Sequence, residues 1–123
     1  MVAMMLWVGF GGFFGAVLRF YAQEYCNQWM PPFPTGTLFV NALGCFIAGI
    51  LMVYLQDHPK TSILRLVSMV GFLGGFTTFS AFSVETLHFT QTGQWRMATL
   101  NVFGNVTLSL AAVFSGAKLA GCL

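Results

Sequence analysis

Long stretches without a charged side chain alternate with short polar segments along this 123-residue chain. Each stretch is close to the about 20 residues that a helix needs to cross the hydrocarbon core of a bilayer. Proline, glycine and charged residues mark the segments between the stretches, as is typical of loops. The uncharged stretches are residues 2–18, 33–55, 66–84 and 97–117.

This pattern predicts four transmembrane helices, over about residues 2–25, 33–55, 62–86 and 95–119. The connections that remain are too short for a domain outside the membrane. Residues 1–123 are therefore predicted to form a single all-α membrane domain that functions within the bilayer. The first stretch lacks a preceding basic segment and a cleavage site of small residues, so we interpret it as a span and not as a signal peptide.

Composition supports a membrane protein and excludes other classes. Hydrophobic residues make up 57% of the chain and charged residues only 7%, against about a quarter charged in soluble domains. The five Lys and Arg residues form no cluster, so no nucleic-acid partner is expected. Cys26, Cys45 and Cys122 are odd in number and lie far apart, so we expect buried thiols and no metal or redox site.

The basic residues give the chain no firm orientation in the membrane. Four spans place Lys60, Arg65 and Lys118 on one side and Arg19 and Arg96 on the other. Because basic residues normally mark the cytoplasmic side, this balance predicts insertion in both orientations. Opposite copies can then pair as an antiparallel, dual-topology homodimer. A protomer of four helices is also too small to enclose a polar path alone, which independently favours a dimer.

Two of the predicted spans carry polar residues at helical spacing. Thr37 and Asn41 share one face of the second span, and Asn101, Asn105 and Ser109 form a stripe along the fourth. One interpretation is hydrogen bonding between helices, worth about 0.6 kcal/mol per bond in a membrane. The other is a polar path through the protein. The residues alone leave both interpretations open.

The third span is predicted to break near the bilayer midplane. Adjacent glycines, Gly74 and Gly75, precede adjacent threonines, Thr77 and Thr78, and both residue types weaken a continuous helix. A break frees backbone carbonyl and N–H groups, which a membrane tolerates only where they meet an ion, water or protein. The alternative is a kink that serves packing alone.

Aromatic and hydroxyl residues follow the predicted break. Phe79 and Phe82 lie three residues apart on one helical face, and Ser80 and Ser83 lie on the adjoining face. A phenyl ring has a positive edge, so ring edges beside hydroxyl donors can stabilise a small anion without a full charge that would trap it. Packing in the core or against lipid is the alternative for such aromatics.

The first span is predicted to pack closely against another helix. Gly11 and Gly15 are four residues apart, the spacing that lets helix backbones approach in lipid. Arg19 follows on the same helix, where its guanidinium can reach the interface or hold loop carbonyls. We therefore predict a structural or vestibule role for Arg19.

These segments together resemble the Fluc (CrcB) fluoride channel family. The motifs are GGxxGAxxR at residues 11–19, GTLxVNxxG at 36–44, GFxGGFTTFSxFSxE at 71–85, and the polar stripe of the fourth span. The resemblance implies an antiparallel dual-topology homodimer with two pores, which passively exports cytoplasmic fluoride with high selectivity over chloride. It also implies a bacterial inner-membrane location.

The resemblance further implies roles for individual residues. Phe79 and Phe82 match the family's pore phenylalanines, and Asn41 matches its pore asparagine. Gly74 and Thr77 match the residues whose backbone carbonyls hold a structural sodium ion at the dimer axis, and Glu85 matches an acidic residue near the pore mouth. The matches to the polar track are Thr37, Ser80, Ser83 and Ser109, with Asn101 and Asn105 at less constant positions.

Other functions remain as alternatives. A small dual-topology multidrug or cation transporter needs a titratable carboxylate deep in a span, whereas Asp57 lies in a loop and Glu85 at the end of the third span. A structural subunit of a larger membrane complex would use the glycine faces for packing only. Enzymatic chemistry is not expected, because His58 and His88 lie apart from any carboxylate pair or nucleophile.

Overall fold

Residues 1–121 are described by the computed structural model, and every regular element among them is a helix. The prediction of an all-helical chain with four helices of membrane-spanning length and composition is confirmed. Cys122, predicted to be a buried thiol, lies outside the described residues. The elements are α1 (Val2–Cys26), α2 (Thr35–Tyr54), α3 (Ile63–Arg65), η1 (Leu66–Leu73), α4 (Gly74–Phe76), α5 (Phe79–Gln91) and α6 (Trp95–Leu119).

Local sequence explains where several helices begin and end. Pro34 immediately precedes α2. The Ser62 hydroxyl accepts a hydrogen bond from the Arg65 amide (3.4 Å) at the start of α3. Between α5 and α6 the chain turns at Gly93, whose φ of 73° lies in the left-handed region that glycine adopts without strain. These helices therefore begin and end at residues that are suited to caps and turns.

The third span is built from several consecutive pieces. α3, the π-helical segment η1 and the single turn α4 follow one another without interruption as far as Phe76. Thr77 and Thr78 then have extended backbone, with ψ values of 155° and 118° respectively, and α5 begins at Phe79. The π-helix is uncommon in proteins and occurs frequently beside functional sites.

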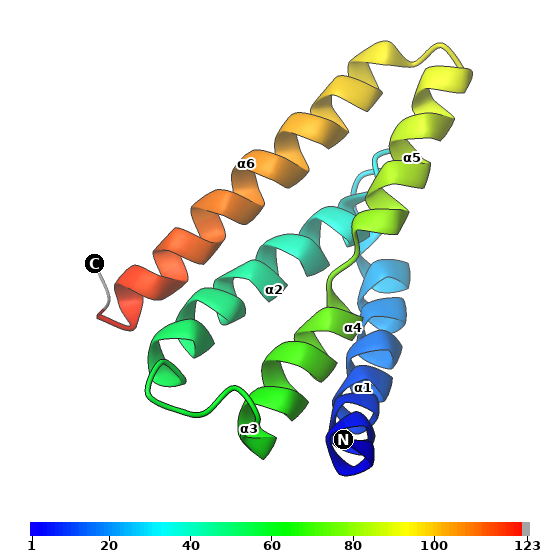
Figure 1. The fold of residues 1–123 in the computed structure, drawn as a ribbon. Helices are drawn as coiled ribbons and strands as arrows, with labels where there is room; N and C mark the ends of the chain where they lie inside the picture. Colours follow the sequence, from blue (N-terminus) through cyan, green and yellow to red (C-terminus); the bar gives the residue numbers. More distant parts are fainter. Residues whose placement is uncertain (122–123) are drawn as a thin grey trace.

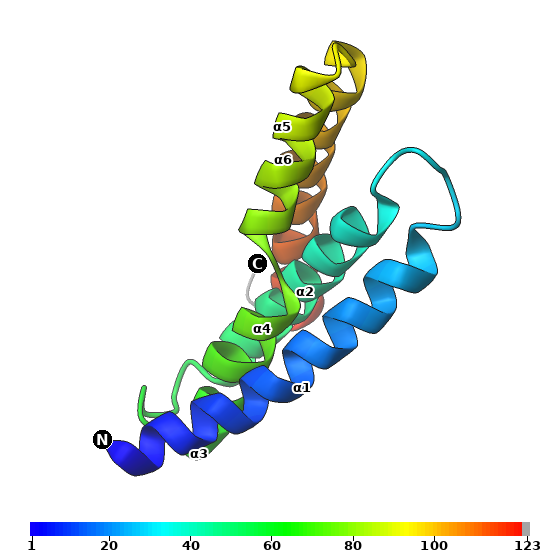
Figure 2. The ribbon, with the colours of Figure 1, turned by 90° about the vertical axis from the view of Figure 1, so that its right-hand side faces the viewer.

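The two parts of this span pack against different neighbours. η1 and α4 lie against α1, whereas α5 lies against α6. α2 lies alongside α6 over most of its length, although the two helices are distant in sequence. α2 lies between α6 and α1, in the centre of the molecule (Figure 1). Figure 2 shows α5 and α6 rising together away from α1. The Thr77–Thr78 segment is thus the point at which the third span changes partners.

Glycines bring helix backbones into direct contact along two seams. A Cβ atom added at Gly11 would collide with the Val67 carbonyl oxygen, and one added at Gly15 with that of Phe72. Between α2 and α6, an added Cβ at Gly49 would meet the Val113 carbonyl in the same way. This close approach is the packing that small residues permit between helices in lipid, and it is what the glycine spacing of α1 predicts.

Large apolar side chains cover the outside of the protomer. On α1, Phe10 is 56% exposed and Phe13 is 65% exposed, while the buried positions of this helix are Gly11, Gly15 and Cys26. Such a surface is unsuited to water but suited to lipid or to another apolar helix. α1 therefore turns its small residues inward and its aromatic residues outward.

Candidate functional site

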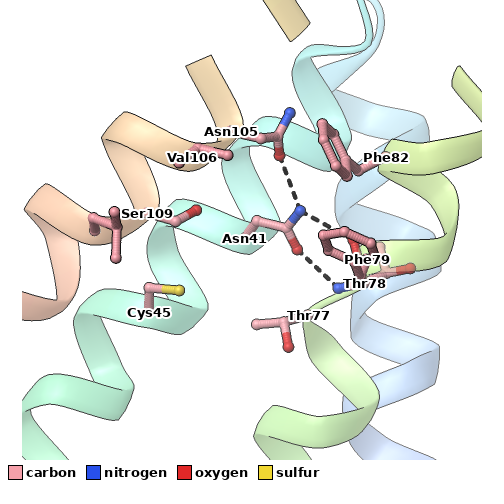
Figure 3. Close-up of a pocket in the computed structure, with 10 residues that line it drawn as sticks. Asn41, Cys45, Thr77, Thr78, Phe79, Phe82, Asn105, Val106 and Ser109 are labelled. Carbon is pink, nitrogen blue, oxygen red and sulfur yellow. Dashed lines mark hydrogen bonds between the residues drawn. The ribbon is translucent and has the colours of Figure 1, made fainter. Parts of the chain in front are cut away.

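A cavity of about 340 Å³ lies where the extended Thr77–Thr78 segment faces α2 and α6. Its walls come from three segments that are distant in sequence: α2, the end of the break with the first turn of α5, and the middle of α6 (Figure 3). The residues that line it are all uncharged: Asn41, Cys45, Thr77, Thr78, Phe79, Phe82, Asn105, Val106, Ser109 and Leu110.

Asn41 of α2 clamps the extended segment. Its Oδ1 accepts the Thr78 backbone N–H (2.8 Å), and its Nδ2 donates to the Thr78 carbonyl oxygen (3.1 Å). The same Nδ2 also donates to Asn105 Oδ1 of α6 (2.9 Å), and Figure 3 shows these bonds meeting at the Asn41 amide. One side chain thus supplies the hydrogen bonds that a helical backbone would otherwise give Thr78.

The hydrogen-bonded chain continues along α6. Asn105 Nδ2 donates to Asn101 Oδ1 (2.9 Å) and to the Asn101 carbonyl oxygen (3.1 Å). Asn101 Nδ2 donates to Thr86 Oγ1 (3.1 Å) and to the Phe82 carbonyl oxygen (3.4 Å) of α5. The amide groups of Asn41, Asn105 and Asn101 are therefore occupied with one another and with α5, which fixes the walls of the cavity.

Two phenyl rings from the first turn of α5 face each other beside this chain. The rings of Phe79 and Phe82 have centroids 5.2 Å apart and an interplanar angle of 60°, an edge-on arrangement. Phe82 is 8% exposed, whereas Phe79 is 78% exposed. The Thr78 hydroxyl accepts a hydrogen bond from the Ala81 amide (3.1 Å) and caps this turn. The Phe82 ring is thus buried within the protomer, and the Phe79 ring is exposed on its surface.

The predicted hydroxyl residues differ in their surroundings. Ser109 lines the cavity, and its hydroxyl makes no hydrogen bond within residues 1–121, whereas that of Ser115 on the same helix donates to the Ala111 carbonyl (2.7 Å). Ser80 lies outside the cavity wall and contacts the Thr78 hydroxyl (3.1 Å). Ser83 is exposed and donates to the Phe79 carbonyl (2.8 Å). Of these serines, only Ser109 brings a free donor to the cavity.

Thr37 and Glu85 form a separate polar cluster with Gln23 of α1. The Thr37 hydroxyl donates to Glu85 Oε1, and Gln23 Nε2 donates to Thr37 Oγ1 (2.9 Å). Glu85 Oε2 is buried and has no hydrogen-bond partner among the described residues. Arg19 is half-buried on α1 and is not part of the cavity wall. These predicted site residues therefore lie outside the wall of the cavity that the phenyl rings line.

Gly74 and Thr77 have carbonyl oxygens that lose their usual helical donors. In a continuous helix the Thr78 amide would donate to Gly74, but here it donates to Asn41 Oδ1 (2.8 Å). The Ala81 amide would donate to Thr77, but it donates to the Thr78 hydroxyl (3.1 Å) instead. Within residues 1–121 no three His, Cys, Asp or Glu side chains gather in a metal-binding arrangement.

Sequence reasoning missed several residues of the cavity and of the polar chain. Cys45 lies four residues after Asn41, so helical spacing alone places it on the same face. Thr78 was part of the predicted break, but its role as the partner of Asn41 depends on a contact between distant spans. Thr86, Val106 and Leu110 carried no signal beyond their position on an apolar helix.

Comparison with known proteins places these residues in a family context. The model of the family described as CrcB-like protein, Camphor Resistance (CrcB), matches residues 6–117. A protein of Campylobacter jejuni subsp. jejuni serotype O:6, named fluoride-specific ion channel FluC, is 44% identical over 117 residues, which cover 94% of this chain and 96% of the relative. Relatives of the same name from Saccharophagus degradans and Magnetococcus marinus are each 43% identical and cover 90% and 89% of this chain, and 86% and 91% of their own lengths.

Proposed function

The chain belongs to the CrcB-like protein family, and from this membership we propose that it is a fluoride-specific ion channel that exports fluoride passively. Its relatives carry this function in their names, and its four membrane-length helices make it a multi-pass membrane protein. It is a channel and not an enzyme. The dual-topology multidrug or cation transporter is not favoured, since no carboxylate lines the cavity described above.

The observation that carries the proposal is the uncharged lining of the cavity. A pore must hold its ion strongly enough to admit it and weakly enough to release it. Phenyl ring edges, a serine hydroxyl and the positive end of the α5 helix, which begins at Phe79, attract an anion without a full opposing charge. A Lys or Arg side chain in the cavity wall would bind fluoride more firmly and slow its release.

The asparagine chain serves as the scaffold of this path. Because the amide hydrogens of Asn41, Asn105 and Asn101 are engaged in the hydrogen bonds given above, we assign the contacts with fluoride first to Ser109 and to the ring edges of Phe79 and Phe82. Thr37, Ser80 and Ser83 continue the polar track toward the surfaces. Glu85 and Arg19 lie near its mouths.

A second copy of the chain in the opposite orientation completes each pore in this proposal. The protomer leaves Phe79 78% exposed and Ser83 exposed beside it, which supports a partner that covers them. The nearly balanced basic residues support insertion in both orientations. Two-fold symmetry then gives an antiparallel homodimer two equivalent pores, each with phenyl rings from both subunits.

The extended Thr77–Thr78 segment lies at the bilayer midplane in this arrangement. The carbonyls of Gly74 and Thr77, whose usual donors bond elsewhere, fit a sodium ion bound at the two-fold axis, because each would meet its own copy there. When bound, sodium supplies a positive charge that offsets the facing carbonyl dipoles and joins the subunits. Asn41 prepares the site by drawing the Thr78 amide away from Gly74.

Electrochemistry sets the direction of transport in the bacterial inner membrane, where we place the channel. Hydrogen fluoride crosses membranes uncharged and dissociates at neutral cytoplasmic pH, so fluoride accumulates inside a cell that lives in an acidic medium. A negative-inside potential drives the anion outward by about 2.3 kcal/mol per charge for each 100 mV. A passive pore is therefore sufficient to relieve fluoride toxicity.

Anion efflux from liposomes tests the proposal. Vesicles that contain the purified protein are loaded with fluoride or chloride, and release is followed with an ion-selective electrode. We expect rapid fluoride efflux, negligible chloride efflux, and loss of fluoride efflux in Phe82→Ile. Phe103→Ile is the matched control, because Phe103 lies on α6 with 64% of its surface exposed, away from the cavity.

Two outcomes contradict the proposal. Absence of fluoride efflux from well-folded protein removes the channel function. Equal efflux in Phe82→Ile and the wild type removes the phenyl ring from the path. Labelling of a single cysteine, Lys118→Cys in a background without the native thiols, tests topology: dual insertion predicts partial labelling from each side of the membrane, and labelling from one side only excludes it.

A further inference from the structure

A second cavity, of about 280 Å³, lies where the end of α2 meets the start of the third span. It is separate from the cavity beside Phe79 and Phe82 and shares no residue with it. The lining residues are Met52, Val53, Gln56, His58, Lys60 and Arg65.

Four of the six residues that line this cavity carry donor or cationic groups. Arg65 donates through a terminal guanidinium nitrogen to the Leu55 carbonyl oxygen at the end of α2, which fixes the guanidinium at the cavity wall. Its Nε atom has no hydrogen-bond partner among the described residues. Lys60 and Gln56 supply further donors, and although Asp57 belongs to the same loop it does not line the cavity. The chemistry of these residues suits a phosphate group.

The other two residues that line the cavity are apolar. Met52 and Val53 belong to the last turns of α2, and Met52 is 61% exposed. α2 is one of the helices with membrane-spanning length and composition, so its end lies near the level of the lipid headgroups. A free anion gains nothing from this apolar wall, whereas a phospholipid places its phosphate beside Lys60 and Arg65 and an acyl chain along α2.

We propose that this cavity binds the phosphate headgroup of an anionic phospholipid, with Lys60 and Arg65 as the cationic contacts and Met52 as the contact for the acyl chain. The inference goes beyond fluoride conduction and does not depend on it. The bound lipid joins the end of α2 to the start of the third span.

Lipid binding to the purified full-length protein tests this proposal. Native mass spectrometry measures the retention of phosphatidylglycerol and, separately, of zwitterionic phosphatidylcholine. Lys60→Gln is the test variant, because the Lys60 side chain is exposed and makes no hydrogen bond within the described residues. The substitution should therefore leave the fold unchanged. Lys118→Gln removes the same charge from the last turn of α6, outside the cavity, and is the matched control.

We expect phosphatidylglycerol to bind more tightly than phosphatidylcholine and to bind about fivefold more weakly to Lys60→Gln, the loss expected for about 1 kcal/mol per basic residue near the membrane. Lys118→Gln should bind as the wild type does. Equal losses in both variants, or equal retention of the two lipids, overturn the proposal. Displacement of phosphatidylglycerol by millimolar inorganic phosphate also overturns the proposal, because it identifies a free anion as the ligand of the cavity.

Discussion

η1 and α4, the first half of the third span, contact α1 through glycine backbones, whereas α5, the second half, contacts α6 through asparagine and threonine side chains. In the first half, a Cβ added at Gly71 would fall against the Val8 carbonyl oxygen and one added at Gly75 against that of Gly12, 2.6 Å away. In the second half, Asn101 reaches the Phe82 carbonyl (3.4 Å) and Thr86 Oγ1 (3.1 Å). One span thus combines two ways of holding helices together in lipid.

The difference explains where the cavity lies. Backbones in direct contact leave no space for an ion and allow little adjustment, so the glycine seam fixes the position of the third span. Asparagine side chains join α2, α5 and α6 around the cavity, while α2 and α6 also meet in direct backbone contact farther along, at Gly49 and Gly116. The rigid half therefore positions the residues of the polar half.

Breaking the glycine seam should have the largest effect. Gly15→Val places a side chain against the Phe72 carbonyl, and overpacking of this kind costs about 3 kcal/mol, at the upper end of the usual range, because neither backbone can move aside. Gly9→Val on the same helix is the control, since an added Cβ there meets nothing within 4 Å. Unfolding followed by tryptophan fluorescence in detergent measures both; equal stability of the two variants would show that the seam is not rigid.

Removing the clamp on the extended segment should have the next largest effect. Asn41→Leu leaves the Thr78 backbone groups and Asn105 Oδ1 without their partner. Under the proposed function, fluoride efflux falls at least about tenfold, which corresponds to about 1.4 kcal/mol on the barrier. Cys45→Ala is the control, because Cys45 lines the same cavity and makes no hydrogen bond within residues 1–121. Unchanged efflux in Asn41→Leu would contradict the role of the clamp.

The end of the asparagine chain should tolerate more. Thr86→Val removes one of the two acceptors of Asn101 Nδ2 and should cost about 0.6 kcal/mol, the value typical of one hydrogen bond between membrane helices. Thr107→Val is matched to it, because within residues 1–121 the Thr107 hydroxyl bonds only to a carbonyl of its own helix, that of Phe103 (2.5 Å). A loss of stability in Thr107→Val as large as that in Thr86→Val would argue against any special value of the buried chain.

The smallest effect is expected within the glycine seam itself. At Gly12 an added Cβ would lie 3.7 Å from the Gly71 carbonyl oxygen, which is an ordinary van der Waals contact. Gly12→Ala should therefore change the free energy of unfolding by no more than about 0.5 kcal/mol, as for surface substitutions. A much larger loss would mean that α1 needs glycine at position 12 as well as at Gly11 and Gly15.

The sequence was sufficient to predict four helices of membrane length, because uncharged stretches of about 20 residues have few other structural solutions. The Gly11 and Gly15 spacing also predicted a close helix contact, although not that η1 would be the partner. The packing of α2 against α6 was not predictable, since these two spans are distant along the chain. The π-helical conformation of η1 was not predictable either. Hydrophobic periodicity does not specify which backbone carbonyl accepts the hydrogen bond of each amide.

Part of the candidate site was predictable for similar reasons. The polar stripes contained Asn41, Asn105 and Ser109, which the structure brings to one cavity, and helical spacing alone groups such residues. Thr37 shares a face with Asn41 in sequence, yet it bonds to Gln23 and Glu85 instead. Which polar residues meet depends on the rotation of each helix and on its neighbours, and a single sequence specifies neither.

The clamp between Asn41 and Thr78 bears on the order in which the chain assembles. A span alone in lipid must satisfy its backbone groups internally, so before α2 docks the Thr78 amide would remain bonded to Gly74 in a continuous helix. Docking of α2 then exchanges that bond for the one to Asn41 Oδ1 (2.8 Å). We therefore expect the interruption of the third span to be acquired late in folding, as a property of the assembled bundle and not of the inserted helix.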